Sequence, residues 1–320
     1  MKRVIVTGAT GFIGANLARR LLTDGHEIHL LVRDGHQPWR IEGIKTQVQL
    51  HTVDMTDAEA MVRVVAGVRP DWVFHLSAHG AYSWQSDLQG MVRTNIIGTI
   101  NLVEACLKTG FDAFVNAGSS SEYGYKDHPP AETECLDPNS YYAVTKASAT
   151  MYCRYTAKLR GVSLVTLRFY SVYGPYEEPG RLIPMLVLNG RAGCLPPLVN
   201  PDIARDFVYV GDAVDACLLA ATRPDQEPGS VYNVGTGVQT SIREVASVAR
   251  RVMGINAKPE WGSMPARAWD TSVWVADNRT IRSRLGWEPR YTFEEGFCQT
   301  VRWFDDNPAL MPVYQKSAGT

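Results

Sequence analysis

The sequence lacks both a long apolar run and a large net charge. No apolar stretch reaches the roughly 20 residues that a helix needs to span a bilayer. The 32 basic and 33 acidic residues give a formal net charge of −1. No global field therefore attracts nucleic acid or an anionic membrane, and neither is expected as a partner. Any anionic ligand must be held by local arginines and by helix ends.

Patterns typical of disulfide frameworks and metal sites are also missing. The six cysteines form no C-x-x-C pair and the seven histidines form no H-E-x-x-H pattern, so we expect reduced thiols and no metal. A strand is predicted from Arg3 onward, which leaves no room for a signal peptide. These observations favour a cytoplasmic protein.

Short β-branched runs alternate with helical patterns through the first half of the chain. Strands are predicted at 3–7, 28–32, 49–53, 72–76, 113–117 and 163–168, and helices at 12–23, 58–66 and 91–108. This rhythm predicts an α/β fold with a Rossmann-type doubly wound parallel sheet. Because ligands of such sheets bind beyond the carboxyl ends of the strands, we expect functional residues directly after strands.

Three glycines with the spacing G-x-x-G-x-x-G follow the first predicted strand. Gly8 permits a tight turn, Gly11 lets the backbone approach a pyrophosphate, and Gly14 lets the helix pack closely against the strand. The helix that begins with Phe12 and Ile13 would point its N–H groups at the phosphates. The alternative is a glycine-rich turn in an unrelated α/β protein, but the strand–turn–helix context favours a dinucleotide.

The end of the second predicted strand bears on the choice between NAD and NADP. An acid there would hold the adenosine ribose and favour NAD, but Val32 is followed by Arg33 and Asp34. The Arg33 guanidinium suits a 2′-phosphate, with Arg40 as a second clamp, so NADP is favoured. In the alternative, Asp34 holds the ribose, Arg33 is a solvated loop charge, and the cofactor is NAD.

Residues after the third and fourth predicted strands complete the expected cofactor site. Asp54 and Met55 follow the third strand, where Asp54 is placed to contact the adenine edge. A helix N-cap is an equally good role for Asp54. Leu76, Ser77 and Ala78 end or follow the fourth strand and are expected to contact the dinucleotide.

The alternation of strands and helices becomes less regular after about residue 170, where prolines divide the chain into short segments. Helical patterns return at 212–221, 242–252 and 292–304. We interpret residues 1–170 as a dinucleotide-binding domain, to whose sheet part of 205–240 returns. Residues 171–312 then form a smaller, mainly C-terminal α/β substrate-binding domain that is interleaved with it. The polar tail after Pro312 is expected to fray.

Tyr142 and Lys146 stand four residues apart on a predicted helix and therefore share one face. Lys146 can lower the pKa of the phenol and hold the nicotinamide ribose, so both residues would also contact the cofactor. A phenol whose pKa is ordinarily about 10 needs such help to act as an acid or base near neutrality. Tyr141 is the rival phenol, but it lies five residues from Lys146 and off that face.

A third member of the catalytic group is expected after the fifth predicted strand, in the run of Ser119, Ser120 and Ser121. One serine hydroxyl would bind the reacting oxygen and align it with the tyrosine. Serine also bonds nearby backbone in turns, and for any single serine this is a strong alternative.

Several ordered motifs together resemble the extended short-chain dehydrogenase/reductase family, which comprises nucleotide-sugar epimerases, dehydratases and reductases. The matching pieces lie at 7–14, 75–78, 95–99, 119–124, 142–146, 168–175, 205–210, 233–235 and 285–287. The resemblance covers nearly the whole chain. It implies that Ser119 is the catalytic serine, Tyr142 the acid/base and Lys146 its partner. It also implies a homodimer built through two helices of each subunit, one of them the Tyr142 helix.

The resemblance also implies a nucleotide-diphosphate sugar as substrate. Arg205 would bind the diphosphate, Arg267 resembles a second such position, and Asp270 would lie near the nucleoside ribose. A surface ion pair between Arg205 and Asp206 is the plainer alternative. Ser171 stands where many members have asparagine, which leaves the usual phosphate or sugar contact there open.

The sugar pocket is expected between the loop after the fourth strand and the serines after the fifth. His79 and Tyr82 are candidates to hydrogen-bond the sugar, together with Ser120 and Ser121. Family dehydratases carry an acid within two positions of the catalytic serine or threonine. Ser120 and Ser121 occupy these positions and Glu122 should point elsewhere, so a 4,6-dehydratase is disfavoured.

Two redox functions remain from the sequence. One is an NADP(H)-dependent reductase of a 4-keto sugar nucleotide, which Arg33 favours. The other is an NAD-dependent 4-epimerase that retains its cofactor. An alternative of another class is a redox-inactive Rossmann-type binding protein, which would be expected to lack the Ser–Tyr–Lys group that this chain carries.

Overall fold

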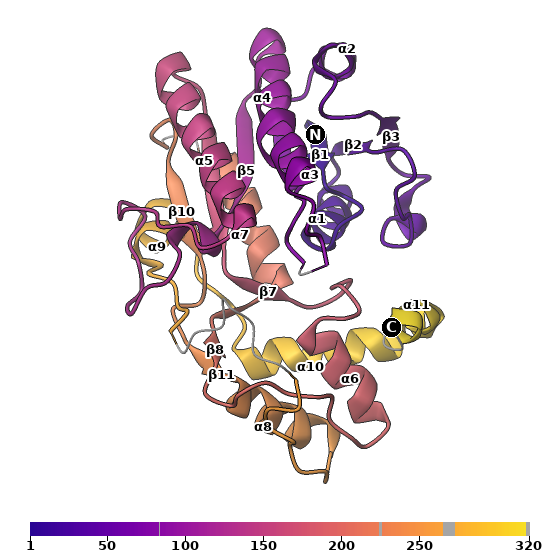
Figure 1. Cartoon of the computed structure of the whole chain (residues 1–320). Coiled ribbons are helices and arrows are strands. Elements are labelled where there is room, and N and C mark those ends of the chain that lie inside the picture. Colours follow the sequence, from indigo (N-terminus) through magenta and orange to yellow (C-terminus); the bar gives the residue numbers. More distant parts are fainter. Residues whose placement is uncertain (83, 224–225, 265–272, 318–320) are drawn as a thin grey trace.

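A seven-stranded parallel sheet lies in the upper part of the molecule as drawn in Figure 1. The computed structural model describes residues 1–82, 84–223, 226–264 and 273–317. The strand order is β10-β6-β5-β4-β1-β2-β3. The strands are β1 (Arg3–Thr7), β2 (Glu27–Val32), β3 (Gln49–Thr52), β4 (Trp72–His75), β5 (Ala113–Ser119), β6 (Leu164–Phe169) and β10 (Val231–Val234). The predicted Rossmann-type sheet is thus confirmed, and β10 reaches it from within 205–240.

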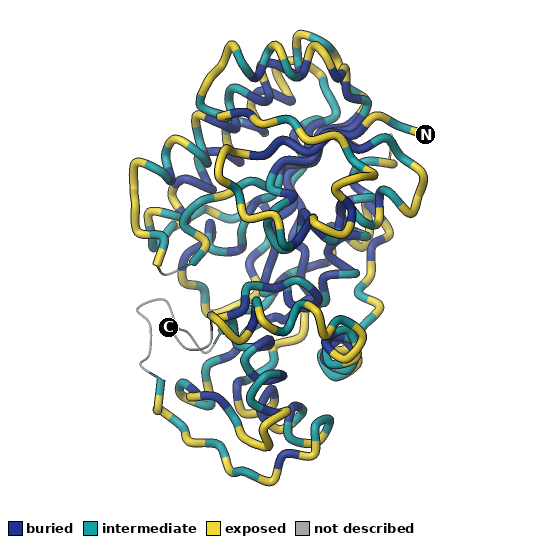
Figure 2. The backbone as a smooth tube through the Cα atoms, turned by 90° about the vertical axis from the view of Figure 1, so that its right-hand side faces the viewer, coloured by how far each residue is buried: buried dark blue, intermediate teal, exposed yellow. Residues whose placement is uncertain are grey.

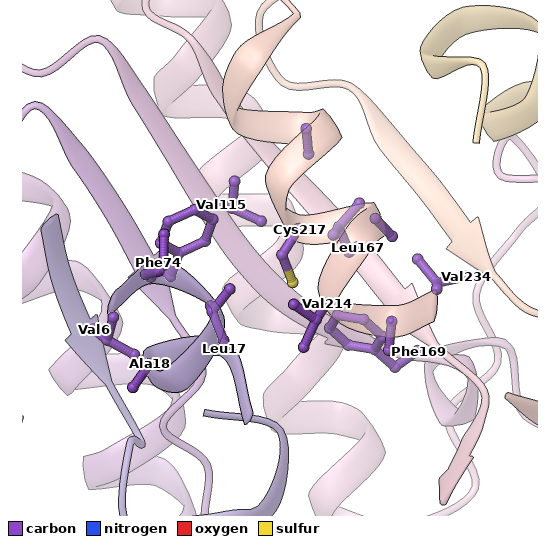
Figure 3. Packing of buried hydrophobic residues seen from close by; sticks show 14 of the residues in the cluster. Val6, Leu17, Ala18, Phe74, Val115, Leu167, Phe169, Val214, Cys217 and Val234 are labelled. Carbon is purple, nitrogen blue, oxygen red and sulfur yellow. The ribbon is translucent and has the colours of Figure 1, made fainter. Parts of the chain in front are cut away.

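Helices cover both faces of this sheet because alternate strand residues point to opposite sides. One face carries α1 (Phe12–Thr23), α7 (Val210–Thr222) and α9 (Arg279–Leu285). The other carries α2 (Ala58–Val68), α4 (Gly98–Thr109) and α5 (Tyr141–Arg160). The parallel register places Val6 beside Phe74 and Phe74 beside Val115. Figure 3 shows this row packed beneath the α1 and α7 side chains.

A smaller second part of the molecule lies below the carboxyl ends of the main strands in Figure 1. It pairs β7 (Ser171–Tyr173) with β9 (Phe207–Tyr209), and β8 (Ala204–Arg205) with β11 (Thr240–Ser241). Its helices are α6 (Leu182–Arg191), α8 (Ile242–Met253), α10 (Phe293–Asp306) and α11 (Met311–Ser317). They enclose a separate apolar core, and Figure 2 shows buried backbone in both parts.

Short helical turns connect these elements. They are η1 (Glu42–Ile44), α3 (Leu88–Met91), η2 (Val92–Ile97), η3 (Ser120–Tyr123) and η4 (Pro308–Leu310). The single helix predicted over 91–108 is therefore wrong in detail, because η2 is a π-helical turn that precedes α4. Such turns reposition side chains along a helix and often occur near functional sites.

The prediction that the tail after Pro312 frays is wrong as far as residue 317. Helix α11 packs here because Tyr314 is fully buried, with its ring centre 4.7 Å from that of the Phe304 ring. The Tyr314 hydroxyl donates to the Glu177 carbonyl at 3.0 Å. The aromatic side chain thus anchors a segment whose other residues are mainly polar or exposed.

Three further observations concern cysteines, metal ligands and membrane-spanning helices. All six cysteines are free thiols. Within the described ranges, no three histidine, cysteine, aspartate or glutamate side chains group as metal ligands would. None of the helices there has both the length and the apolar character needed to cross a bilayer.

Candidate active site

The turn after β1 leaves no room for side chains. Gly8 has φ +69°, and a Cβ there would lie 2.6 Å from backbone atoms of Leu76 and Ser77 at the end of β4. A Cβ on Gly14 would lie 2.3 Å from the Gly8 carbonyl oxygen. The Gly11 N–H donates to that same oxygen at 2.9 Å. Strand, turn and helix are therefore in backbone contact, as a dinucleotide cradle requires.

The N-terminus of α1 points out of this turn without a side-chain cap. Gly11 is the N-cap residue, it offers no side chain, and the first turn contains no acid. The backbone N–H groups that begin the helix, including those of Phe12 and Ile13, keep their capacity to bind an anion. Together with the crowded glycines, this arrangement fits the pyrophosphate of a dinucleotide.

The residues after β2 and β3 lie at the surface. Arg33 and Asp34 are both exposed, and one Asp34 carboxylate oxygen accepts from the Gly35 N–H at 3.0 Å. One Asp54 oxygen accepts from both the N–H and the hydroxyl of Thr56 at 2.8 Å. The N-cap role considered for Asp54 is wrong, because Asp57 is the N-cap of α2 and its side chain accepts from the Ala60 N–H at 2.9 Å.

The structure corrects the expectation for Arg40. Its buried guanidinium donates to the Tyr176 carbonyl at 2.8 Å and to the Thr10 carbonyl at 3.3 Å, and pairs with Glu178 at 2.7 Å. It also lies 4.1 Å from the centre of the Trp39 ring. Arg40 therefore braces the loop after β2 against the segment after β7. We leave it out of the phosphate site.

Tyr142 lies in the first turn of α5, just after its N-cap. Its hydroxyl hydrogen-bonds the Ser119 side chain, and the Ser119 and Ser121 hydroxyl oxygens are 2.7 Å apart. Burial raises the pKa of the Tyr142 phenol to about 12, and the bond with Ser119 partly opposes this rise. Tyr141, by contrast, is 66% exposed. The geometry therefore joins Tyr142, not Tyr141, to the serine at the end of β5.

Lys146 lies one turn further along α5 and is only 3% exposed. Burial lowers the pKa of its ammonium. In the described part of the chain no acceptor or carboxylate bonds this ammonium. The expected lowering of the phenol pKa by Lys146 is not seen, because burial dominates the Tyr142 pKa. Its bare buried ammonium instead suits the ribose hydroxyls of a dinucleotide.

The loop after β4 is tied to α5 through Asn95 in η2. The buried Asn95 amide accepts from the His79 N–H and donates to the His79 carbonyl, both at 2.8 Å. It also donates to Thr145, the neighbour of Lys146, at 2.9 Å. The loop then carries Tyr82, whose ring stacks on Trp84 at 4.7 Å. Asn95 is therefore structural, and it holds His79 beside α5.

Trp274 joins two predicted substrate residues, although sequence reasoning missed it. Its indole N–H donates to the Ser120 hydroxyl at 3.1 Å, and the Arg205 guanidinium lies 5.4 Å from its ring centre. Arg205 is therefore brought toward the serines that follow β5. Arg267 and Asp270 lie outside the described residues. The only sequence signal for a role of Trp274 was its nearness to the predicted substrate residues Arg267 and Asp270.

Asp206 is fully buried, which excludes the alternative of a surface ion pair with Arg205. Its carboxylate accepts from the backbone N–H groups of Thr236, Gly237 and Ala276 at 2.7–3.0 Å. It therefore fixes the loops that surround Arg205. Ser171, on β7, lies beside it and donates its N–H to the Asp206 carbonyl at 3.0 Å.

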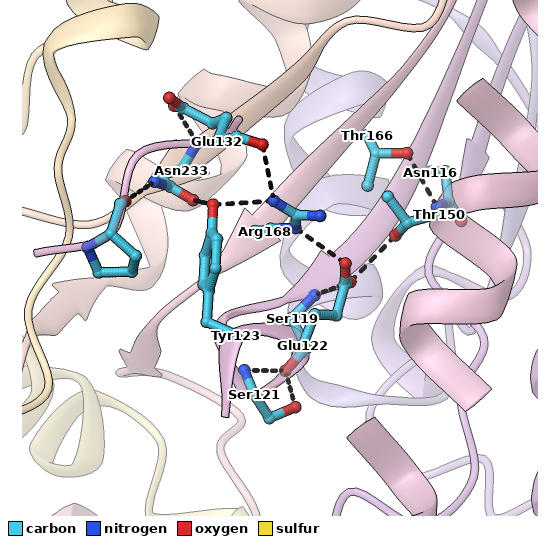
Figure 4. Close-up of polar contacts among 11 residues, drawn as sticks. Asn116, Ser119, Ser121, Glu122, Tyr123, Glu132, Thr150, Thr166, Arg168 and Asn233 are labelled. Atoms are coloured by element: carbon cyan, nitrogen blue, oxygen red, sulfur yellow. Dashed lines mark hydrogen bonds and ion pairs between the residues drawn. The ribbon is translucent and has the colours of Figure 1, made fainter. Parts of the chain in front are cut away.

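Glu122 does not enter the site. Figure 4 shows its buried carboxylate turned toward Arg168, whose Nε lies 2.8 Å away. The other carboxylate oxygen accepts from the Ser119 N–H at 2.8 Å and from the Thr150 hydroxyl at 3.0 Å. Glu122, the first acid after Ser119, therefore does not face a substrate.

The comparisons with known proteins agree with this geometry. Residues 4–235 match the profile described as the NAD dependent epimerase/dehydratase family. The chain belongs to this family. A UDP-glucose 4-epimerase of Mycolicibacterium smegmatis is 31% identical over 94% of this chain and 98% of its own length. A dTDP-glucose 4,6-dehydratase of Streptomyces antibioticus is 27% identical over 99% and 96%.

Solved structures of epimerases resemble the fold closely. A UDP-glucose 4-epimerase of Thermotoga maritima with UDP-glucose covers 95% of this chain and 99% of its own, at 28% identity and a TM-score of 0.85. A UDP-glucose 4-epimerase of Thermus thermophilus with NAD covers the same shares, at 30% identity and a TM-score of 0.83. This member of the epimerase/dehydratase family therefore carries its glycine turn and its Ser119–Tyr142–Lys146 group in the same fold as these nucleotide-sugar epimerases.

Proposed function

We propose that this chain transfers hydride at C4 of a nucleotide-diphosphate sugar, as an NADP(H)-dependent reductase of a 4-keto sugar nucleotide. The hydrogen bond between Tyr142 and Ser119 beside the buried Lys146 carries the proposal. Ser119 ends β5 and interacts with Tyr142 of α5 at the carboxyl ends of the strands, where the turn after β1 also lies.

The proposed chemistry assigns one task to each side chain. A bound dinucleotide supplies the hydride for the C4 carbonyl carbon. The neutral Tyr142 phenol, whose pKa burial raises to about 12, gives its proton to the C4 oxygen. The Ser119 hydroxyl donates to that oxygen and fixes its place. Lys146 binds the hydroxyls of the nicotinamide ribose with its ammonium group.

The same geometry disfavours dehydration. Eliminating water needs one acid for the leaving hydroxyl and one base for the neighbouring C–H. Ser120 accepts from Trp274, Ser121 contacts Ser119, and the Glu122 carboxylate is bound to Arg168. These contacts leave redox chemistry at C4 as the activity that the site supports best.

A second candidate is an NAD-dependent 4-epimerase with retained cofactor. The relative from M. smegmatis, a UDP-glucose 4-epimerase that aligns along 94% of this chain, favours it. Arg33 favours the reductase, because it is exposed at the end of β2 and the structure describes no ion pair that would hold it there. The two functions differ in whether the dinucleotide is consumed.

The decisive experiment measures the released cofactor and the need for added cofactor together. Nucleotides freed from the denatured protein are identified by mass spectrometry, and 4-keto sugar nucleotides and UDP-glucose are tested with and without NADPH. Stoichiometric NADPH consumption supports the reductase. Tightly bound NAD with turnover in the absence of NADPH supports the epimerase and contradicts the reductase.

Arg33→Ala should weaken NADPH binding about tenfold and leave NADH binding nearly unchanged, since one charge-assisted bond to the 2′-phosphate is lost. Fluorescence titration with both dinucleotides measures the two affinities. Asp34→Asn is the matched control in the same exposed loop. If Asp34→Asn weakens NADH binding and Arg33→Ala has no effect on NADPH, the ribose is held by Asp34 and the NADP assignment is wrong.

We further propose that the chain forms a homodimer through α5. The solvent-facing side of this helix carries the exposed apolar residues Val144, Met151, Tyr155 and Leu159, which share one face at spacings of four and seven. The double variant Met151→Lys/Tyr155→Lys should therefore halve the mass measured by analytical ultracentrifugation. Glu59→Lys, an exposed charge change on α2, should leave the mass unchanged. A monomeric parent protein would contradict the proposal.

A further inference from the structure

We propose that Glu122 is a positioning residue of the active site, whose buried carboxylate fixes the Ser119 backbone and supplies the negative charge that faces the Lys146 ammonium. This inference rests on the proposed function, because it concerns the same three catalytic side chains.

Glu122 connects the Ser119 backbone to α5. Glu122 is fully buried in η3, and its Oε1 accepts from the Ser119 N–H at 2.8 Å and from the Thr150 hydroxyl at 3.0 Å. Thr150 lies one helical turn beyond Lys146 on α5. A single carboxylate oxygen therefore links the backbone of the catalytic serine to the helix that carries the other two catalytic residues.

The carboxylate is itself held from the opposite side by β6. Arg168, which is 3% exposed, donates from Nε to Glu122 Oε2 at 2.8 Å and from Nη1 to the Tyr123 hydroxyl at 2.8 Å. Tyr123 in turn donates to Asn233 on β10 at 2.7 Å (Figure 4). The network thus fixes the carboxylate in the low-dielectric interior, where a charge acts strongly on its neighbours.

The side chains of His75, Cys153 and Glu122 interact electrostatically with Lys146. His75 on β4 is neutral, because burial and Lys146 lower its pKa to about 3. Cys153 on α5 is a neutral thiol, because burial raises its pKa to about 12. Burial lowers the pKa of Lys146, and Glu122 opposes that effect. Within the described ranges, Glu122 is thus the anion that opposes the lowering of the Lys146 pKa.

Tyr142 responds to the same charge. Glu122 and Tyr82 raise the pKa of its phenol, whereas Ser119 and Arg181 lower it. Removing the negative charge of Glu122 should therefore lower the pKa of Tyr142 as well as that of Lys146. Both ionisations shift to lower pH, so the whole pH profile moves in one direction.

Glu122→Gln tests the charge with nearly the same shape. The pH profile of kcat/KM should move down by about one pH unit, and kcat should fall roughly tenfold. The KM for the sugar nucleotide should change little, because Glu122 does not face the substrate. Glu122→Asp keeps the charge but shortens the side chain, so it should lower kcat at an unchanged pH optimum.

Glu132→Gln is the matched control. The Glu132 carboxylate is buried in the same network, where it accepts from the Asn233 N–H at 3.0 Å and from the Thr280 hydroxyl at 2.8 Å. Its loss should affect thermal stability without moving the pH profile. A Glu122→Gln profile that stays in place, or an equal shift in Glu132→Gln, would overturn the inference.

A readout that does not depend on turnover separates this inference from the proposed function. The pKa of Lys146 is followed by NMR of ¹³C-lysine-labelled protein, assigned with Lys146→Arg, and should fall in Glu122→Gln but not in Glu132→Gln. If the parent protein turns over no sugar nucleotide, the proposed function is wrong. The Lys146 titration still tests the role of Glu122 in that case. If Glu122→Gln does not fold, Glu122→Asp decides, and wild-type kcat in that variant overturns the positioning role.

Discussion

Tyr142→Phe should reduce sugar-nucleotide turnover between a hundredfold and about ten-thousandfold, the usual contribution of a general acid or base. The substitution removes the only atom that hydrogen-bonds Ser119 from this position and keeps the ring that fills the space. Dinucleotide affinity should stay within about threefold, because Lys146 and the glycine turn are untouched. Initial rates by chromatography of the sugar nucleotides and fluorescence titration of the dinucleotide measure the two effects.

Tyr141→Phe provides an unusually close control. It removes the same atom from the adjacent residue, which faces solvent and is 66% exposed. Its turnover should equal that of the parent protein. If Tyr142→Phe kept more than a tenth of the activity, the acid/base would have to be another group. A parent protein with no turnover on any sugar nucleotide would favour a redox-inactive Rossmann-type binding protein.

The parts of the site that could be predicted from the sequence are those built from local spacing. From β1 through Gly14 the sequence shows the hydrophobic period of a strand, then a glycine turn, then the hydrophobic period of a helix. The conformation of this segment therefore follows from neighbouring residues. The choice of Tyr142 over Tyr141 also followed from helix geometry alone. In both cases residues close together in the sequence determine the arrangement.

The errors concern contacts between residues far apart in the sequence. The sequence predicted Arg40 as a phosphate clamp because it does not reveal the ion pair with Glu178, which stands 138 residues away. Trp274 meets Ser120 across 154 residues, and Tyr314 meets Glu177 across 137. No local pattern encodes such pairs, and a buried guanidinium cannot be told from a solvated one without its environment. The phenol pKa was misjudged for the same reason, since burial dominates it.

Gly14→Ala should destabilise the fold by about 3 kcal/mol and weaken dinucleotide binding at least about tenfold. The new Cβ would lie 2.3 Å from the Gly8 carbonyl oxygen and 2.9 Å from the Ala9 Cα. These are backbone atoms that cannot rotate away as a flexible side chain would. Helix α1 must therefore move off β1, and the N–H groups at its start move with it. Thermal unfolding and fluorescence titration measure the two losses.

Gly67→Ala distinguishes the effect of steric crowding from the effect of helix propensity. Gly67 also lies within a helix, α2, but a Cβ there would meet no atom within 4 Å. Alanine favours a helix over glycine by up to about 1 kcal/mol, so this variant should be as stable as the parent protein or slightly more stable, with unchanged dinucleotide affinity. The same substitution thus has opposite effects at two helical sites because only one faces backbone. Equal stabilities and affinities for both variants would show that close contact at Gly14 is not needed for the cofactor.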